Sequence, residues 1–328
     1  MKDKFFKYLR YVRAFLIGST YYVYDMHKFI KYSRLYTDSK KNETEKRLFY
    51  SLMAKSHIIE KGLSMPERRL GFGHDALWLL IDELEKYVRL YGVNNAQVEH
   101  IIGIILEYKE LHENNNYRLE GKLQKRLDGV SSKFPKVSPS KQIRLSKELL
   151  FGYVNNSFDE FSSSRRSCRH ISGPADIKSI REAIKLALNA PSACNKQPVK
   201  VHLITDLDNV KKILELQQGN RGFGHLLQQL LLITVDIQSY GRFEDRNNSY
   251  LDAGLFSMNL LYALHFYKIA SIPLVWIDNK RRLAALHRLV DFPQEEFPCL
   301  IIGIGIPAKE FITTASQRNV LEDVLTEH

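Results

Sequence analysis

Two short polar stretches, Ser164 to His170 (SRRSCRH) and Ala190 to Pro198 (APSACNKQP), decide how the second half of this chain folds. Between them, residues 175–190 (ADIKSIREAIKLALNA) carry isoleucines and leucines at three- and four-residue intervals, which is typical of an amphipathic helix. Residues 199–205 (VKVHLIT) follow and predict a strand. The order is therefore a basic cluster, a helix, a polar loop and a strand.

The rest of the second half alternates between strands and helices. Apolar runs that predict buried strands stand at residues 230–236 (LLLITVD), 271–277 (SIPLVWI) and 299–307 (CLIIGIGIP). Residues 250–268 (YLDAGLFSMNLLYALHFYK) predict a helix that is apolar on nearly every side. Such a helix must be covered all round, either within a thick domain or by a partner subunit.

The first half has a mainly helical pattern. Apolar residues recur at helical spacing in residues 47–62, 74–91 and 95–112. Residues 131–142 (SSKFPKVSPSKQ) are rich in Ser, Pro and Lys and predict a linker or long loop before one more helix. A chain of 328 residues exceeds what one compact core usually fills. We therefore predict a helical, basic region over residues 1–158 and a second domain over residues 159–328.

The positive charge is concentrated in the first half. Of the formal net charge of +11, residues 1–150 carry +10, from 28 Lys and Arg against 18 Asp and Glu. Such an excess suits the phosphates of lipid or nucleic acid, and it also occurs on surfaces that are merely solvated. The first 35 residues add aromatic side chains in a pattern compatible with an amphipathic helix. Basic charge combined with aromatic side chains suits binding to an anionic membrane surface, or packing against the rest of the chain. It suits binding to nucleic acid less well.

The cysteines and other potential ligands predict neither a metal site nor export. Cys168, Cys194 and Cys299 are odd in number, lie far apart and lack a CxxC spacing, so a reducing cytoplasm fits best. The apolar stretch near the N-terminus is too short for a signal sequence or a membrane span. His57 and Glu60 share one helical face, but two residues without a third ligand are more typical of a polar surface.

The first polar stretch has the chemistry of a phosphate site. Arg165, Arg166 and Arg169 offer three guanidiniums, and Ser167 adds a hydroxyl. Guanidinium groups match the oxygens of a phosphate in pairs through charge-assisted hydrogen bonds. The alternative is a solvated basic run without a ligand.

The second polar stretch combines rigidity with directional hydrogen-bonding groups. Pro191 and Pro198 fix the backbone, while Ser192, Asn195 and Gln197 offer donors and acceptors. A loop of this kind can border the edge of a heteroaromatic ring. The alternative is an ordinary connection between a helix and a strand.

Taken together, the basic cluster, helix, polar loop and strand resemble the opening of the FMN-dependent nitroreductase family. The resemblance implies that Arg165, Ser167 and Arg169 hold the phosphate and ribityl chain of FMN. It also implies that five residues of the second stretch border the isoalloxazine ring, partly from the partner subunit: Pro191, Ser192, Ala193, Asn195 and Gln197.

The resemblance extends to the C-terminus and implies further FMN contacts. Asn220 corresponds in spacing to an Asn near the pyrimidine edge of the flavin, and Val275 and Trp276 to a stretch whose backbone amides approach flavin N5 and O4. Arg318 corresponds to an arginine that returns to the phosphate. Arg169 or Lys196 is the candidate cation for stabilising the negative charge of the reduced flavin.

The implied fold is α+β, with a central, mostly antiparallel sheet flanked by helices and a long buried helix at a dimer interface, preceded by a mainly helical N-terminal region. The implied activity is reduction of a small conjugated acceptor, such as a nitroaromatic, quinone or enone, by NADH or NADPH in a ping-pong scheme. The implied assembly is a homodimer with FMN at the subunit interface, in the cytoplasm or peripherally at the inner membrane face.

Two departures from the family pattern keep an alternative open. Tyr267 to Ser271 replace a G-L-G type turn after the long helix, and Val199 replaces an aromatic residue after the Q-P pair. The alternative is a flavin-binding domain that serves as a noncatalytic regulatory module or is recruited to a membrane surface. The sequence does not settle the acceptor or the choice between NADH and NADPH.

Overall fold

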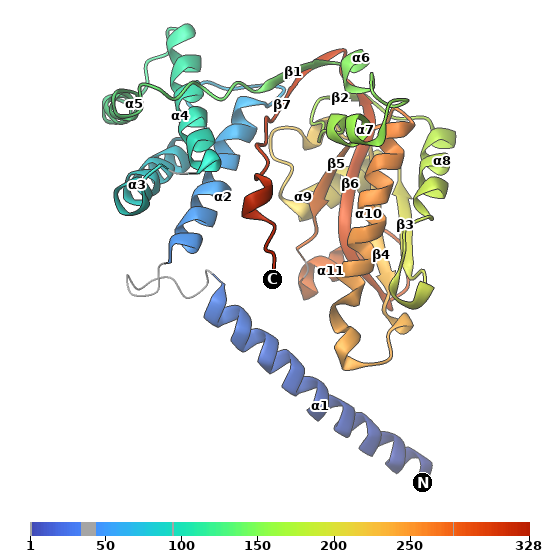
Figure 1. Cartoon of the computed structure of the whole chain (residues 1–328). Helices are drawn as coiled ribbons and strands as arrows, with labels where there is room; N and C mark the ends of the chain where they lie inside the picture. Colours follow the sequence, from blue (N-terminus) through green and yellow to red (C-terminus); the bar gives the residue numbers. More distant parts are fainter. Residues whose placement is uncertain (1, 34–43, 94, 278) are drawn as a thin grey trace. The chain divides into compact units, whose positions relative to one another are not determined.

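The computed structural model describes residues 2–33, 44–93, 95–277 and 279–328 (Figure 1). Contacts between residues divide the chain into two units. Unit 1 consists of Met1–Ile59, Gly73–Pro139 and Gln317–His328, and unit 2 consists of Glu60–Phe72 and Ser140–Ser316. Residues 34–43 of the basic N-terminal region lie outside the described residues. The domain boundary between residues 158 and 159 stays a prediction.

Helices make up the N-terminal part, as predicted. They are α1 (Lys2–Tyr32), α2 (Glu45–Leu63), α3 (His74–Tyr91), α4 (Ala96–Asn114) and α5 (Gly121–Lys133). In α3 the buried side chains Leu77, Ile81 and Leu84 follow the spacing on which the helix was predicted. The predicted linker at residues 131–142 begins later than expected, because α5 continues through Lys133.

Unit 2 combines strands and helices, which confirms the α+β class. Its elements are β1 (Ile143–Ser146), α6 (Lys147–Leu150), α7 (Phe158–Ser164), β2 (Ile171–Gly173), α8 (Ile177–Ala187), β3 (Val199–Ile204), α9 (Leu207–Gln217), β4 (Gln229–Asp236), α10 (Asn248–Phe266), β5 (Ala270–Val275), α11 (Lys280–His287), β6 (Glu296–Pro307) and β7 (Glu310–Thr313). The four segments that the sequence predicted to be strands form β3, β4, β5 and β6. The short strands β1, β2 and β7 carry no comparable apolar signal.

The main sheet is antiparallel, as predicted, and β6 lies at its centre. Its strands run in the order β2-β6-β4-β3, and β5 also pairs with β6. A separate antiparallel pair joins β1 to β7. A parallel bridge between Ser167 and Ser271 of β5 attaches the first polar stretch to the sheet.

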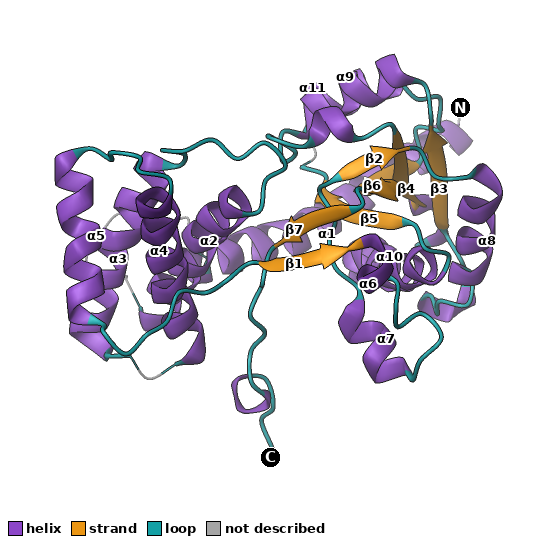
Figure 2. Cartoon of the chain, turned by 90° about the horizontal axis from the view of Figure 1, so that it is seen from above, coloured by secondary structure: helices purple, strands orange, loops and turns teal. Residues whose placement is uncertain are grey.

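Both faces of the main sheet are covered by helices (Figure 2). Successive residues of β4 alternate between the two layers: Leu230 and Leu232 belong to the layer that includes α9 and α11, and Leu231 and Ile233 to the layer with α8 and α10. Strand β4 is therefore buried on both sides, which explains why its sequence is a continuous apolar run.

Within the described residues of unit 2, the long apolar helix α10 is buried on one side and exposed on the other. Its buried side includes Ala253, Phe256 and Leu260, which pack in the layer beside the sheet. The opposite side leaves large apolar side chains exposed, namely Tyr250, Leu251, Leu255, Met258 and Phe266.

Candidate functional site

The first polar stretch is held in place by backbone contacts to two strands. The Cys168 amide donates to the Ser271 carbonyl at 3.0 Å. The Thr313 hydroxyl of β7 donates to the Ser167 carbonyl at 3.1 Å. Because β5 and β7 both contact it, the stretch is fixed although it forms neither a helix nor a strand over Arg165 and Arg166.

Arg169 is a buried cation with unsatisfied hydrogen-bonding groups. Its side chain is 7% exposed, and within the described part of the chain neither Nε nor Nη1 has a hydrogen-bond partner. Its Cζ lies 5.9 Å from the centre of the Phe223 ring. Buried guanidinium groups are normally paired and hydrogen-bonded, since an unpaired charge is costly to remove from water. The donor set therefore fits an anionic group such as the phosphate of FMN.

A second cation, Lys61, interacts electrostatically with Arg169. Burial lowers the pKa of Lys61, and the Arg169 guanidinium lowers it further. The Lys61 ammonium donates to the Gly219 carbonyl at 3.5 Å. Gly219 and Phe223 belong to the same loop, so both cations lie beside the segment that joins α9 to β4.

One buried carboxylate balances this pair only in part. Glu60 is 3% exposed, and its Oε1 accepts a hydrogen bond from the Ser316 amide at 2.7 Å. Burial lowers the pKa of Arg169, and the Glu60 carboxylate acts in the opposite direction. Two cations against one carboxylate leave a positive site. Glu60 and Lys61 stand at the end of α2, far from the first polar stretch in sequence, and no sequence motif marks them as part of a site.

Arg166 and His170 of the first stretch line two separate cavities. His170 and Arg68 belong to the lining of a cavity of about 480 Å³ in unit 2. The His170 ring contacts the Ser64 carbonyl through Nε2 at 2.9 Å, and burial followed by Arg169 lowers its pKa. Arg166 lines another cavity of about 420 Å³ with Tyr153 and Glu160. Arg166 and Arg169, predicted as one phosphate cluster, therefore have different surroundings.

The second polar stretch forms an exposed loop with an unusual backbone. Cys194, Asn195 and Gln197 have positive φ angles of 52°, 54° and 52°. Non-glycine residues adopt this region at a cost, and they persist there when surrounding contacts hold them. The Ser192 hydroxyl accepts from the Gln197 amide at 2.9 Å, and the Gln197 side chain donates to Asn195 Oδ1 at 3.2 Å. Hydrogen bonds within the loop thus hold Ser192, Asn195 and Gln197 close together.

The buried carboxylate of Asp252 in α10 anchors this loop. Its Oδ1 accepts from the Ala193 amide at 2.9 Å, and its Oδ2 accepts from the Tyr240 hydroxyl at 2.7 Å. Asp252 is 1% exposed, and Lys196 lies 5.4 Å from the centre of the Tyr240 ring. The sequence analysis missed this role. The available signal is that Asp252 is the one acidic residue of an otherwise apolar helix.

The other residues predicted to contact FMN differ in burial and in surroundings. The Asn220 side chain donates to the Leu214 carbonyl at 2.6 Å and to Gln217 Oε1 at 3.0 Å, so it closes the end of α9. Val275 is 66% exposed, whereas Trp276 is 6% exposed and packs in the layer with α9 and α11. Arg318 is exposed and belongs to unit 1. The FMN contacts of these residues stay predictions.

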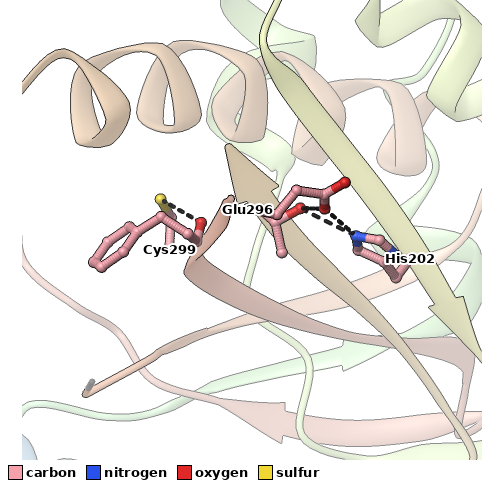
Figure 3. A network of polar contacts seen from close by, with 5 residues as sticks. His202, Glu296 and Cys299 are labelled. Atoms are coloured by element: carbon pink, nitrogen blue, oxygen red, sulfur yellow. Dashed lines mark hydrogen bonds and ion pairs between the residues drawn. The ribbon is translucent and has the colours of Figure 1, made fainter. Parts of the chain in front are cut away.

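A second polar network lies elsewhere on the main sheet (Figure 3). His202 Nε2 is 2.7 Å from Glu296 Oε2 and 3.0 Å from the Thr234 hydroxyl. A catalytic triad needs the carboxylate and the hydroxyl on opposite ring nitrogens. Here both contact Nε2, so the network joins β3, β4 and β6 without forming such a triad. Cys168 is no better a nucleophile, because burial raises the pKa of its thiol to about 12.

No protein-family model matches this chain, and no curated protein matches it. Solved structures of nitroreductase family proteins match about half of the chain. One is a nitroreductase family protein from Streptococcus pneumoniae TIGR4, at 20% identity over 52% of this chain and 100% of that chain, with a TM-score of 0.45. Another is a provisionally named nitroreductase in complex with FMN from Desulfovibrio desulfuricans, at 19% identity over 53% of this chain and 98% of that chain, with a TM-score of 0.45. A third is NfrA2 from B. megaterium, at 18% identity over 52% of this chain and 72% of that chain, with a TM-score of 0.43.

Proposed function

We propose that unit 2 binds FMN and that the protein is an FMN-dependent oxidoreductase. NADH or NADPH would serve as electron donor and a small conjugated molecule, such as a nitroaromatic, quinone or enone, as acceptor, the two binding in turn. FMN supplies the electron-transfer chemistry when bound, so the protein needs mainly to position it and tune the surrounding charge. The observation that carries the proposal is the buried Arg169 side chain, whose Nε and Nη1 lack partners while Lys61 adds a second cation nearby.

In this proposal the chain's own residues divide the work of binding. Arg165, Ser167, Arg169 and Lys61 hold the phosphate and ribityl chain. The loop from Pro191 to Gln197 borders the ring. Asp252 contributes without touching the cofactor, because its carboxylate holds the loop at the Ala193 amide.

A homodimer would complete the site. The exposed side of α10 carries Leu251, Leu255, Met258 and Phe266 at three-, four- and eight-residue intervals, so these apolar side chains share one face. A contiguous exposed apolar face of this kind is typical of an interaction surface. We propose that a second copy covers it and that the protein works in the reducing cytoplasm.

The altered turn after α10 keeps a backbone shape that glycine would favour. Lys268 has a φ angle of 58°, in the left-handed region. Its amide donates to the His265 carbonyl at 3.0 Å. A left-handed lysine costs on the order of 1 kcal/mol relative to glycine, so the surrounding contacts hold this turn in its shape.

The experiment is cofactor identification followed by anaerobic reduction. Purified protein is expected to be yellow, to release FMN when denatured, and to bleach with NADH or NADPH. Addition of a nitroaromatic or quinone should restore the colour. A yellow protein that never bleaches with either donor would instead support the flavin-binding regulatory module, and a protein without flavin affinity would remove both.

A further inference from the structure

Helix α1 carries an exposed apolar face of unusual length. Successive residues of an α-helix are separated by about 100°, so positions spaced by three, four and seven residues share a face. One such face contains Phe5, Leu9, Val12, Leu16, Val23 and Ile30. Five of these are exposed, and Val12 is half-buried. A line of apolar side chains over most of a 31-residue helix is costly in water unless something covers it.

Aromatic and basic side chains are arranged around this face. Tyr8, Phe15, Tyr22 and Phe29 repeat every seven residues along one edge, and all are exposed. Arg10, Arg13, Lys28 and Lys31 lie away from the centre of this face and are exposed, and the exposed side chains of Phe6, Ile17 and Tyr24 stand among them. Over residues 4–32 there are six Lys and Arg and a single acidic residue, Asp25. The helix therefore combines an apolar face, an aromatic edge and cationic side chains.

This combination fits the surface of a membrane whose lipids carry negative charge. Apolar side chains enter the boundary of the acyl chains, aromatic rings lie at the headgroups, and long cationic side chains reach the lipid phosphates. None of the described helices is long and apolar enough to cross a membrane, so α1 would lie along the surface. A second copy of α1 is a poorer partner, because two helices of the same high positive charge repel each other.

We propose that α1 is an interfacial helix that attaches the protein to anionic lipid bilayers, with the Phe5 to Ile30 face buried and the arginine and lysine side chains facing the headgroups. This attachment is independent of flavin binding in unit 2. It gives the basic N-terminal region a role that the proposed activity does not require.

Co-sedimentation of the full chain with lipid vesicles tests the proposal. The protein should pellet with vesicles of phosphatidylcholine and phosphatidylglycerol, far less with phosphatidylcholine alone, and less as salt is raised. Leu16→Asp should abolish pelleting. Arg10→Gln with Lys28→Gln should weaken the partition constant roughly 25-fold, because each cation near such a surface contributes about fivefold.

Matched controls place the same changes outside α1. Leu207→Asp alters an exposed leucine of α9, and Lys178→Gln with Lys185→Gln removes two exposed charges from α8. Both controls should pellet like the unaltered protein. Flavin content, measured in parallel, separates a failure here from a failure of the proposed activity.

Three results would overturn the proposal. The first is absence of pelleting with the anionic vesicles. The second is a Leu16→Asp protein whose Tm without lipid falls by several degrees, because α1 would then pack against its own chain. The third is a change of oligomeric state on Leu16→Asp without vesicle binding, because a second copy would then cover the face.

Discussion

The guanidinium of Arg169 lowers the pKa of Lys61, so a cation from the segment before β2 and a cation from the end of α2 share one part of unit 2. Glu60, next to Lys61, offsets them only partly, because it carries one negative charge against their two positive charges. Two cations forced together in a half-dry environment are stabilised when an anion binds between or beside them. The pair therefore gives the proposed flavin binding a specific and testable chemical basis.

Replacing Arg169 with Met should weaken FMN binding without changing the thermal stability of the FMN-free protein. FMN affinity should fall about 30-fold, because a hydrogen bond to a charged group is worth roughly 1.5–3 kcal/mol. The Tm of the FMN-free protein should change little, because the lost attraction to Glu60 is offset by removing a buried guanidinium whose Nε and Nη1 lack hydrogen-bond partners. Flavin fluorescence titration and thermal unfolding measure the two effects. Arg181→Met, on the exposed side of α8, is the control and should leave both unchanged.

Replacing Lys61 with Met should weaken FMN binding by a smaller factor. We expect about fivefold, since Lys61 is only half-buried and water screens part of its charge. Raising the salt concentration should reduce the difference between the two proteins. Lys46→Met, an exposed position on the same helix, is the matched control. Equal affinities for Lys61→Met and Lys46→Met would show that Lys61 takes no part in the site.

Asp252→Asn should release the second polar loop. Asn keeps one acceptor oxygen and has an NH2 group in place of the second, so the Tyr240 hydroxyl loses the charged acceptor to which it donates. The free energy of unfolding should fall by about 1–3 kcal/mol, and FMN affinity should fall with it. Urea unfolding with and without FMN gives both quantities. Asp208→Asn, at an exposed position of α9, should change neither, and an Asp252→Asn protein with normal flavin affinity would exclude the loop from the site.

Stability should depend on pH through His265. Its Nε2 contacts the Ser164 hydroxyl at 2.8 Å, and burial followed by the Arg165 charge lowers its pKa to about 4. The unfolded chain, with an ordinary His pKa near 6.5, binds more protons between these values. The contribution of neutral His265 to the free energy of unfolding is therefore fully present above about pH 6.5. It is lost as the pH falls toward 4, and the total loss is about 3 kcal/mol.

Urea unfolding at pH 7 and pH 4.5 measures this loss, with His265→Gln as the comparison. The Gln protein keeps a polar group at this position but cannot gain the proton. Its stability should decline less between the two pH values. An identical decline in both proteins would mean that other groups cause it.

The elements that the sequence predicted well are those whose side-chain pattern reports directly on burial. Strand β4 is a continuous apolar run because both faces are covered, and α3 repeats its buried leucines at helical spacing. Strands β1 and β7 were missed because four residues are too few for an alternating pattern to be recognised in the sequence. Their pairing depends on contacts between distant segments.

The candidate site was predictable only where its residues are adjacent in sequence. The Arg165 to Arg169 stretch and the Pro191 to Gln197 loop are both visible as local motifs. Lys61 was not, because its closeness to Arg169 arises from folding across more than a hundred residues. Asp252 could be noticed as a lone acid in an apolar helix, but its partner, the Ala193 amide, is a backbone group without a sequence signal.

The most direct test of the central claim is the affinity of the purified full chain for riboflavin 5′-phosphate, measured by quenching of flavin fluorescence. The account predicts saturable one-to-one binding that is at least tenfold tighter than that of riboflavin, because the phosphate provides the contact to Arg169 and Lys61. Arg169→Met should remove this preference for the phosphate. Equal affinity for riboflavin and its phosphate, or no measurable binding of either, would contradict the account.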